Sequence, residues 1–323
     1  MMNRQLPNFF EGRDWLSLYL KHPDPQFLPQ EINLEDNSST YVFLGKVNLS
    51  NLLETSIPLP SLSVLFWGNP ITDLFPACNS TNEIEMQIEK VFNLAKSQNV
   101  SAIAVKDLPD GHFLEESLIK REFIPIEHDP IWYYKVPMSL DEFFFTLSKG
   151  RRRGLKNRWM RFQKMVQVRE ATPNDISFIM TAYEHTWQKA VLKLEKLTID
   201  FYLAALRNEH CKIFIYEHNN TPFAFTLLYL KDQMIFDKYI GSIPALAYQF
   251  SFYSMSMLYI LDWAKKQGFQ WYVAGQGSGE SKRALGFSAI PCKIWTKPLK
   301  LTRVLMLLSN RIIKTHSKRI RCI

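Results

Sequence analysis

The chain has 323 residues, of which 46% are hydrophobic and 22% are charged, and this excludes a disordered or fibrous protein. Its four cysteines form no CxxC pair, which excludes a disulfide scaffold or a zinc ribbon and fits a reducing compartment. The net charge of +8 is uneven, because nine Lys and Arg lie between Lys149 and Arg169 and eleven between Lys282 and Arg321, with no acid in either band. Each band is either a solvated face or a contact for an anionic partner such as cofactor phosphate, RNA or lipid.

The first fifteen residues are charged and contain no apolar segment typical of a secretory signal. No uninterrupted apolar run reaches the ~18 residues that suggest a membrane-spanning helix. We therefore expect a cytoplasmic protein, and its residue pattern suggests no metal site.

The first part of the chain alternates helical and extended patterns, which predicts an α/β fold. We expect helices and strands in this order: helix 14–21, strand 40–47, strand 63–67, helix 82–97, strand 100–105, helix 113–121 and strand 131–136. Pro137 then interrupts the pattern, and Ser139 with Glu142 forms a capping box that starts a new helix. We expect that helix to reach Met165 and place a lobe boundary near residue 137, between an N-terminal lobe 1–137 and a C-terminal lobe 138–323.

The second part predicts a largely antiparallel sheet with flanking helices. Its expected elements are strand 166–169, a helix capped at 172–175 and reaching 189, helix 197–208, strands 211–217, 223–230 and 234–240, a long helix 248–267, strand 269–273, strand 294–297 and an amphipathic basic helix 299–315. The last helix packs on the sheet or lies on an anionic membrane, and the tail beyond it is free to touch lipid or nucleic acid.

Four stretches, taken together and in order, resemble the FemAB-like and BioF2-like acyltransferases of the GNAT superfamily. They are 9–16, the basic segment 147–158, the strand 235–241 and the run 274–287, which looks like a closing G…(Y/H)K…GF signature. The resemblance implies two GNAT-like lobes, each with a mixed, largely antiparallel sheet flanked by helices. It also implies acyl transfer from acyl-CoA to an amine or peptide acceptor by direct attack.

One signature of simple GNAT enzymes is missing, since no Q/R-x-x-G-x-G/A run precedes the long helix. The residues there are 243–250, and FemAB-like proteins often lack the signature as well. The resemblance therefore leaves a FemX-type transfer from aminoacyl-tRNA open as an alternative. A further alternative is a GNAT-fold protein without catalytic activity that binds RNA or an anionic membrane.

Acyl transfer needs a bound donor, a base for the amine and a proton for the leaving group. Asp237 is a candidate base in the strand 234–240, where strict alternation puts it on one face with Tyr239; otherwise it is a surface aspartate paired with a lysine. Glu280 is a second candidate base. Tyr239, Tyr248 and Tyr253 are candidate acids, or packing residues.

Two sets of residues are candidates for donor phosphates. The first is the expected start of the long helix, namely Ala247, Tyr248, Gln249, Phe250 and Ser251, of which the aromatic residues could instead be core. The second is Arg151, Arg152 and Arg153 in the first basic band, which also interleaves aromatic residues as RNA-binding segments do.

The loop after strand 269–273 is glycine-rich and is followed directly by basic residues, which suits a phosphate or a substrate carboxylate. Its candidate substrate-binding residues are Gly275, Gln276, Gly277, Lys282 and Arg283. His185 and Trp187 are further candidates, on the helix that shapes the acceptor pocket in this fold. A plain turn and an ordinary surface histidine are the alternatives.

Overall fold

The structure is a computed structural model that describes residues 12–33, 39–48, 61–68, 81–189 and 196–300. The chain divides into two compact units. Unit 1 comprises Met1–Leu18, Asp129–Ala190 and Thr198–Ile290, and unit 2 comprises Tyr19–His128, Val191–Leu197 and Pro291–Ile323. Packing thus groups the residues discontinuously, and the division into lobes 1–137 and 138–323 stays a prediction.

Unit 1 contains a sheet in the order β5-β10-β9-β8-β7-β6. Its strands are β5 (Ile124–Lys135, of which the last part belongs to this unit), β6 (Gln167–Glu170), β7 (Cys211–His218), β8 (Thr221–Lys231), β9 (Met234–Ser242) and β10 (Trp271–Gly275). Neighbouring strands are antiparallel except for the pair of β9 and β10. Left-handed Asn219 and Asn220 form the turn between β7 and β8, as their sequence predicts.

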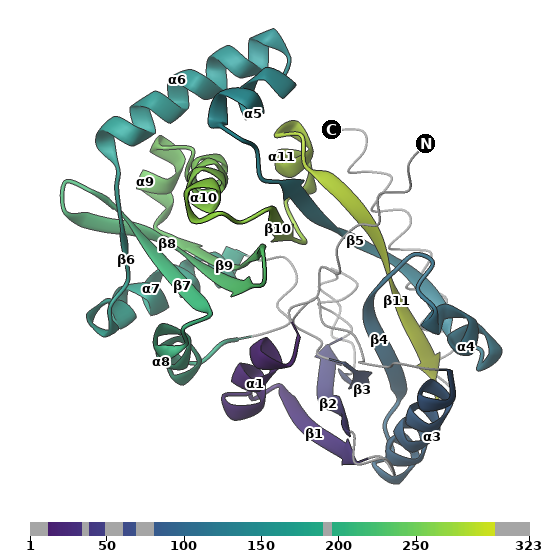
Figure 1. The fold of residues 1–323 in the computed structure, drawn as a ribbon. Coiled ribbons are helices and arrows are strands. Elements are labelled where there is room, and N and C mark those ends of the chain that lie inside the picture. The colour runs from purple at the N-terminus through teal and green to yellow at the C-terminus, as the bar shows by residue number, and fades with distance from the viewer. Residues whose placement is uncertain (1–11, 34–38, 49–60, 69–80, 190–195, 301–323) are drawn as a thin grey trace. The chain divides into compact units, whose positions relative to one another are not determined.

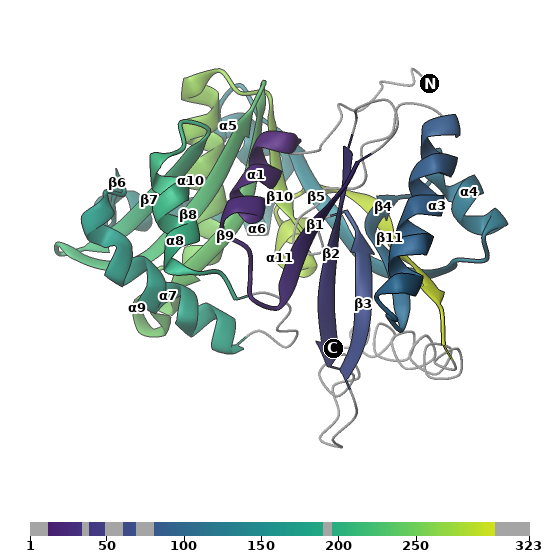
Figure 2. The ribbon, with the colours of Figure 1, turned by 90° about the horizontal axis from the view of Figure 1, so that it is seen from below.

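Helices cover both faces of this sheet. They are α5 (Leu140–Thr146), α6 (Lys149–Met165), the 3₁₀ turn η1 (Pro173–Asp175), α7 (Ile176–Lys189), α8 (Ile199–Arg207), α9 (Pro244–Gln249), α10 (Phe252–Gln267) and α11 (Gly279–Ala284). Figures 1 and 2 show α10 on one face and α7 and α8 on the other. The α/β class with a mixed, largely antiparallel sheet and flanking helices is therefore confirmed.

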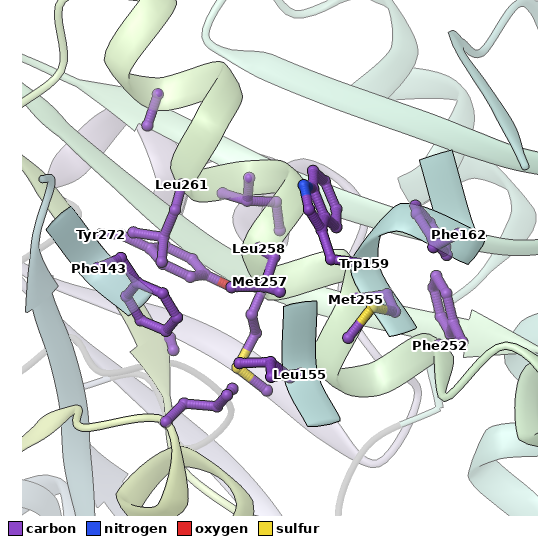
Figure 3. Packing of buried hydrophobic residues seen from close by; sticks show 14 of the residues in the cluster. Phe143, Leu155, Trp159, Phe162, Phe252, Met255, Met257, Leu258, Leu261 and Tyr272 are labelled. Carbon is purple, nitrogen blue, oxygen red and sulfur yellow. The ribbon is translucent and has the colours of Figure 1, made fainter. Parts of the chain in front are cut away.

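The core of unit 1 lies between α6, α10 and the sheet (Figure 3). Leu155, Trp159 and Phe162 are the buried residues of α6, and their spacing places them on one side of that helix. The rings of Trp159 and Phe162 are stacked with centroids 5.7 Å apart. Burial of each such side chain contributes about 2 kcal/mol, so this apolar stripe fixes α6 to the unit although its other faces are strongly basic.

The helix expected over 139–165 is two helices, which corrects the sequence prediction. Ser139 caps α5 as predicted, accepting the backbone N–H of Glu142 at 3.1 Å. At Leu147, however, the backbone becomes extended, with φ −88° and ψ 151°, and α6 starts again at Lys149. Periodicity does not reveal this break because both helices carry apolar residues at helical spacing.

Unit 2 has a sheet in the order β1-β2-β3-β4-β11. Its elements are β1 (Phe27–Asn33), β2 (Ser39–Asn48), β3 (Ser61–Trp67), α3 (Thr81–Ser97), β4 (Ala102–Pro109), α4 (Leu114–Lys120) and most of β11 (Ser288–Pro298), while α1 (Arg13–Lys21) begins in unit 1. Ile84, Ile88 and Val91 of α3 are buried against the sheet, as their spacing predicts. Strand β1 is not predicted from the sequence, because Pro29 interrupts its extended pattern.

The structure describes only the first part of the second basic band, up to Lys300. The helix expected over 299–315 and the basic tail lie almost entirely outside the described residues, so their contact with lipid or nucleic acid stays a prediction. No helix in the described part of the chain is long and apolar enough to cross a membrane.

Candidate active site at the separation of β9 and β10

The two parallel strands β9 and β10 pair over only three residues. Their register joins Met234 to Trp271, Ile235 to Tyr272 and Phe236 to Val273. Beyond Phe236, β9 continues to Ser242 in pairing with β8, but no longer with β10. Asp237 is therefore the first residue of β9 past the end of the shared ladder. A strand edge that lacks a neighbouring strand offers its backbone groups to a ligand.

A β-bulge in β9 sets the direction of the side chains at this point. Leu228 of β8 pairs with Asp237 and Leu227 pairs with Tyr239, so Lys238 is the extra residue. Such a residue breaks the strict alternation of faces. Asp237 points to Tyr272, whereas the ring of Tyr239 contacts those of Tyr183 and Phe201. The prediction that Asp237 and Tyr239 share a face is wrong for this reason.

Asp237 is surrounded by groups that tune its acidity. Its Oδ2 accepts a hydrogen bond of 2.6 Å from the hydroxyl of Tyr272. Burial raises the pKa of Asp237 to about 6, although the Tyr272 hydrogen bond and the charges of Lys282 and Lys238 act in the opposite direction. A carboxylate with a pKa near neutrality can both accept and return a proton at physiological pH.

Buried tyrosines adjoin the aspartate. Burial raises the pKa of Tyr253 to about 12, and its hydroxyl is hydrogen-bonded to Ser278. Burial also raises the pKa of Tyr272 well above its usual value, and the Asp237 charge adds to this effect. Both phenols therefore stay protonated, and Tyr272 donates its proton to Asp237. The sequence analysis missed Tyr272, whose only signal is a polar tip within a buried strand next to the glycine-rich loop.

Lys282 holds the loop between β10 and α11 in place. Its side chain is only 2% exposed, and Nζ donates to the carbonyl oxygens of Gly275 at 3.1 Å and Gln276 at 2.7 Å. Gln276 in turn donates its side-chain amide to the carbonyl of Asp129 at 2.7 Å. These bonds give Lys282 and Gln276 a role in shaping the loop, and their contact with a substrate stays a prediction.

The other candidates on this loop are more exposed. Glu280 lies exposed in the first turn of α11, and among the described residues no hydrogen bond or ion pair joins it to Asp237. The guanidinium of Arg283 lies 5.5 Å from the ring centroid of Trp132. Gly277 has φ +72°, which few other residues adopt at low cost. The assignments of Glu280 as a base and of Gly277 and Arg283 as substrate ligands are not tested by this arrangement.

The proposed donor-phosphate segment differs from its predicted form. Instead of one helix from Tyr248, α9 ends at Gln249, and left-handed Ser251, with φ 50°, separates it from α10. Ala247, Tyr248 and Gln249 therefore lie at the end of α9, away from any helix N-terminus. Phe250 is buried against Phe223, as core residues are, whereas Tyr248 is 90% exposed. Of the five residues, only Phe250 and Ser251 directly precede the start of the long helix.

The three arginines at the start of α6 have different surroundings. Arg152 donates to the carbonyls of Phe145 at 3.2 Å and Leu147 at 3.1 Å, so it ties α6 to the end of α5. Arg151 and Arg153 are exposed, and within the described residues the structure gives them no ion pair. These two, with Arg158 further along α6, are exposed to an external anion.

His185 and Trp187 lie near the end of α7, which packs against the end of β9. Thr186 between them accepts the backbone N–H of Ser242 at 3.2 Å. His185 is exposed and Trp187 is partly buried. Their part in binding an acceptor stays a prediction. Among the described residues, no group of three or more His, Cys, Asp or Glu could hold a metal ion.

Comparison with known proteins matches the middle of the chain to one family model. Residues 149–283 match the family model described as "Acetyltransferase (GNAT) domain". No curated protein matches the sequence.

Solved structures with the same fold cover nearly the whole chain. FemX is similar with a TM-score of 0.60 and 10% identity, over 94% of this chain and 99% of that one. L-PGS from Bacillus licheniformis is similar with a TM-score of 0.60 and 11% identity, over 93% and 96%. The C-terminal DUF2156 domain of a putative lysylphosphatidylglycerol synthetase from Agrobacterium fabrum has a TM-score of 0.59 and 9% identity, over 88% and 89%. Residues 149–283 are thus similar to a GNAT acetyltransferase domain, in a chain that shares its fold with FemX and L-PGS.

Proposed function

We propose that the protein transfers an acyl group from an acyl-CoA to an amine, with Asp237 as the general base. The observation that carries this proposal is a carboxylate with a pKa of about 6 at the point where β9 and β10 separate. Proton transfer is most efficient when the pKa of the catalytic group lies near the working pH.

The proposed reaction needs no covalent enzyme intermediate. The amine nitrogen attacks the thioester carbonyl, a C–N bond forms and the C–S bond breaks. Asp237 takes the proton that the nitrogen loses and returns it to the leaving sulfur, so the carboxylate is restored. Tyr272 holds the carboxylate in place through its 2.6 Å hydrogen bond, while Tyr253, whose acidity responds to the Asp237 charge, is closer to the reaction than Tyr239.

The test is a mass-shifted product when the full chain is incubated with a panel of acyl-CoAs and cellular amines. Asp237→Asn should lower the turnover at least about 100-fold, the usual contribution of a general base. Glu280→Gln is the matched control, because Glu280 is exposed and outside the Asp237 group. If Asp237→Asn retains turnover while Glu280→Gln loses it, the base has been assigned to the wrong carboxylate.

A second donor is favoured by a specific observation on α6. Arg151, Arg153 and Arg158 are exposed and have no ion-pair partner among the described residues. Together they form a basic face that suits the phosphates of a polynucleotide, and FemX is among the similar folds. We infer that an aminoacyl-tRNA is the alternative donor, with the same base and the same acceptor nitrogen.

Salt dependence separates the two donors. If tRNA binds through α6, its affinity falls with salt concentration, with a logarithmic slope of about 0.7–0.9 per neutralised phosphate. Exchange of Arg151, Arg153 and Arg158 for Glu should then abolish tRNA binding. An unchanged tRNA affinity in this variant contradicts the role of α6.

A further inference from the structure

An unsatisfied polar group lies beside the loop that follows β10. Trp132 of β5 is only 4% exposed, and its indole Nε1 has no hydrogen-bond partner in the structure. Buried indole N–H groups usually have an acceptor, because an unpaired buried donor is costly. This donor is therefore a candidate contact for an acceptor outside the chain.

The indole edge faces Gly279 at the start of α11. A Cβ at Gly279 would lie 3.0 Å from Cζ2 and 3.3 Å from Nε1 of Trp132. A side chain there would displace the indole edge, so the glycine allows the close approach of Trp132 to the loop. The indole Nε1 thus lies beside the backbone at Gly279.

The loop itself has the backbone of an anion-binding segment. Gly275, Gly277 and Ser278 have positive φ values of 65°, 72° and 46°. Left-handed Ser278 directly precedes Gly279, the first residue of α11, and such a pair of left-handed and right-handed residues turns neighbouring backbone N–H groups to the same side, where they form a concave anion site. The guanidinium of Arg283, 5.5 Å from the Trp132 ring centroid, adds a positive charge at the same place.

The loop also adjoins the candidate base. Ser278 is hydrogen-bonded to Tyr253, and the acidity of Tyr253 responds to the charge of Asp237. Trp132 and Trp295 each belong to the buried apolar cluster of their unit, and the buried Nε1 of each lacks a partner. What distinguishes Trp132 is the backbone loop and the arginine beside it.

We propose that Trp132 Nε1, the backbone N–H groups of residues 277–279 and Arg283 bind an oxyanion, a carboxylate or a phosphate, that the amine acceptor carries. This rests on the proposed function and names its substrate class: amines with an anionic group, such as amino acids or phosphorylated amines. Glu280 is the acidic side chain of the loop and opposes this binding, so its removal should tighten it.

The test is a titration of the full chain with inorganic phosphate and, separately, with acetate, followed by the indole NMR signals of its eight tryptophans. The Trp132 signal is identified by its loss in Trp132→Phe. It should shift in a saturable way with at least one of the two anions, while sodium chloride at equal ionic strength has no such effect. Whichever anion saturates the site shows whether the acceptor carries a carboxylate or a phosphate.

Variants measure each contribution through the backbone amide signals of Gly277 and Gly279. Trp132→Phe and Arg283→Gln should each weaken anion binding about tenfold, the value of one hydrogen bond to a charged group. Glu280→Gln should strengthen binding, and Trp295→Phe should leave it unchanged. The proposal is overturned if neither anion gives a saturable shift, or if Trp132→Phe and Arg283→Gln both leave the affinity unchanged.

This result is independent of turnover. Asp237→Asn should keep the anion-dependent shift even though it loses acyl transfer. If that variant loses turnover and the parent protein shows no anion shift, the proposed acceptor site is wrong, but the assignment of Asp237 as the base stands.

Discussion

At the scale of single residues, the hydrogen bond between Tyr272 and Asp237 controls the charge of the proposed base. Burial raises the pKa of Asp237, and the phenol lowers it again by stabilising the ionised form. The bond therefore decides at which pH the carboxylate is ready to accept a proton. The effect can be measured without knowledge of the natural acceptor, provided that one amine is turned over.

Tyr272→Phe should shift the pH dependence of acyl transfer to higher pH. Loss of the hydrogen bond raises the pKa of Asp237 further above its present value of about 6. The pH of half-maximal rate should rise by about one unit, since one pKa unit corresponds to about 1.4 kcal/mol of interaction with the charged form. The measurement is kcat/KM against pH for both proteins.

Tyr239→Phe is the matched control for this experiment. It removes a hydroxyl from the same strand, but on the face that contacts Tyr183 and Phe201. Its pH profile should keep the parent midpoint. Equal midpoints for the parent protein and Tyr272→Phe would show that Asp237 is not the group that titrates in the rate.

The same raised pKa affects stability. A carboxyl group whose pKa is higher in the folded protein than in the unfolded chain contributes stability below the unfolded pKa, and this is lost as the pH rises through the folded pKa. For Asp237 that window runs from about 4 to about 6. Asp237→Asn should therefore be more stable than the parent protein above pH 6, by up to about 3 kcal/mol, and should lose this advantage near pH 4. Urea unfolding at both pH values checks this, and a pH-independent difference would contradict it.

The residue scale also shows what the sequence can predict of a site. Asp237 was identifiable because a lone acid in an apolar strand is unusual. Tyr272 and Trp132 were not identifiable, because tyrosine and tryptophan in a strand are usually core residues. Only the structure shows that the Tyr272 hydroxyl has a hydrogen-bond partner and that the Trp132 indole N–H has none. The prediction that Asp237 and Tyr239 share a face is wrong because a single extra residue, Lys238, shifts the alternation of side chains along β9 by one position.

At the scale of elements, close packing of α7 on β9 fixes the far end of the active-site strand. A Cβ at Gly241 would lie 2.8 Å from the backbone of both Ala182 and Tyr183. The backbone of an α-helix cannot yield as a flexible side chain does. Gly154 in α6 is the opposite case, because a Cβ there would meet nothing within 4 Å.

Gly241→Ala should destabilise the protein by about 2 kcal/mol, because it forces α7 away from β9. Gly154→Ala should stabilise it by about 1 kcal/mol, because alanine favours an exposed helix position over glycine. Chemical unfolding of both variants measures whether each substitution lowers or raises the free energy of unfolding. A neutral Gly241→Ala would mean that α7 is not held against β9 as closely as the structure shows.

Most elements were predictable from apolar periodicity, and two of the exceptions share one cause. The helix expected over 139–165 is divided into two helices at Leu147. The helix expected over 248–267 begins only after left-handed Ser251, which separates it from a short helix before it. A backbone change at one residue leaves the apolar spacing on both sides intact, so the pattern continues through the break. For Ser251 the consequence is functional, since it moves the start of α10 and with it the N–H groups that a donor phosphate would meet.

At the scale of the whole molecule, the two units have separate apolar cores. The core of unit 1 gathers α6, α10 and strands β7 to β10, and that of unit 2 gathers α3, α4 and strands β2 to β4. The proposed donor and acceptor residues that the structure describes all belong to unit 1. Two strands, β5 and β11, contribute residues to both units, so a covalent connection exists but the cores are distinct.

Binding of the correct acyl-CoA should therefore stabilise unit 1 more than unit 2. A ligand that binds only the folded state adds about 2.7 kcal/mol at 100 times its dissociation constant. Hydrogen exchange resolved by peptide should show this gain in α10 and not in α3, because each cooperative unit opens with its own free energy. Acyl-CoA and tRNA are compared in the same way, with free CoA as the control for binding without an acyl group. Equal protection of α10 and α3 would show that the cores unfold as one, and protection by tRNA alone would transfer the donor assignment to the aminoacyl ester.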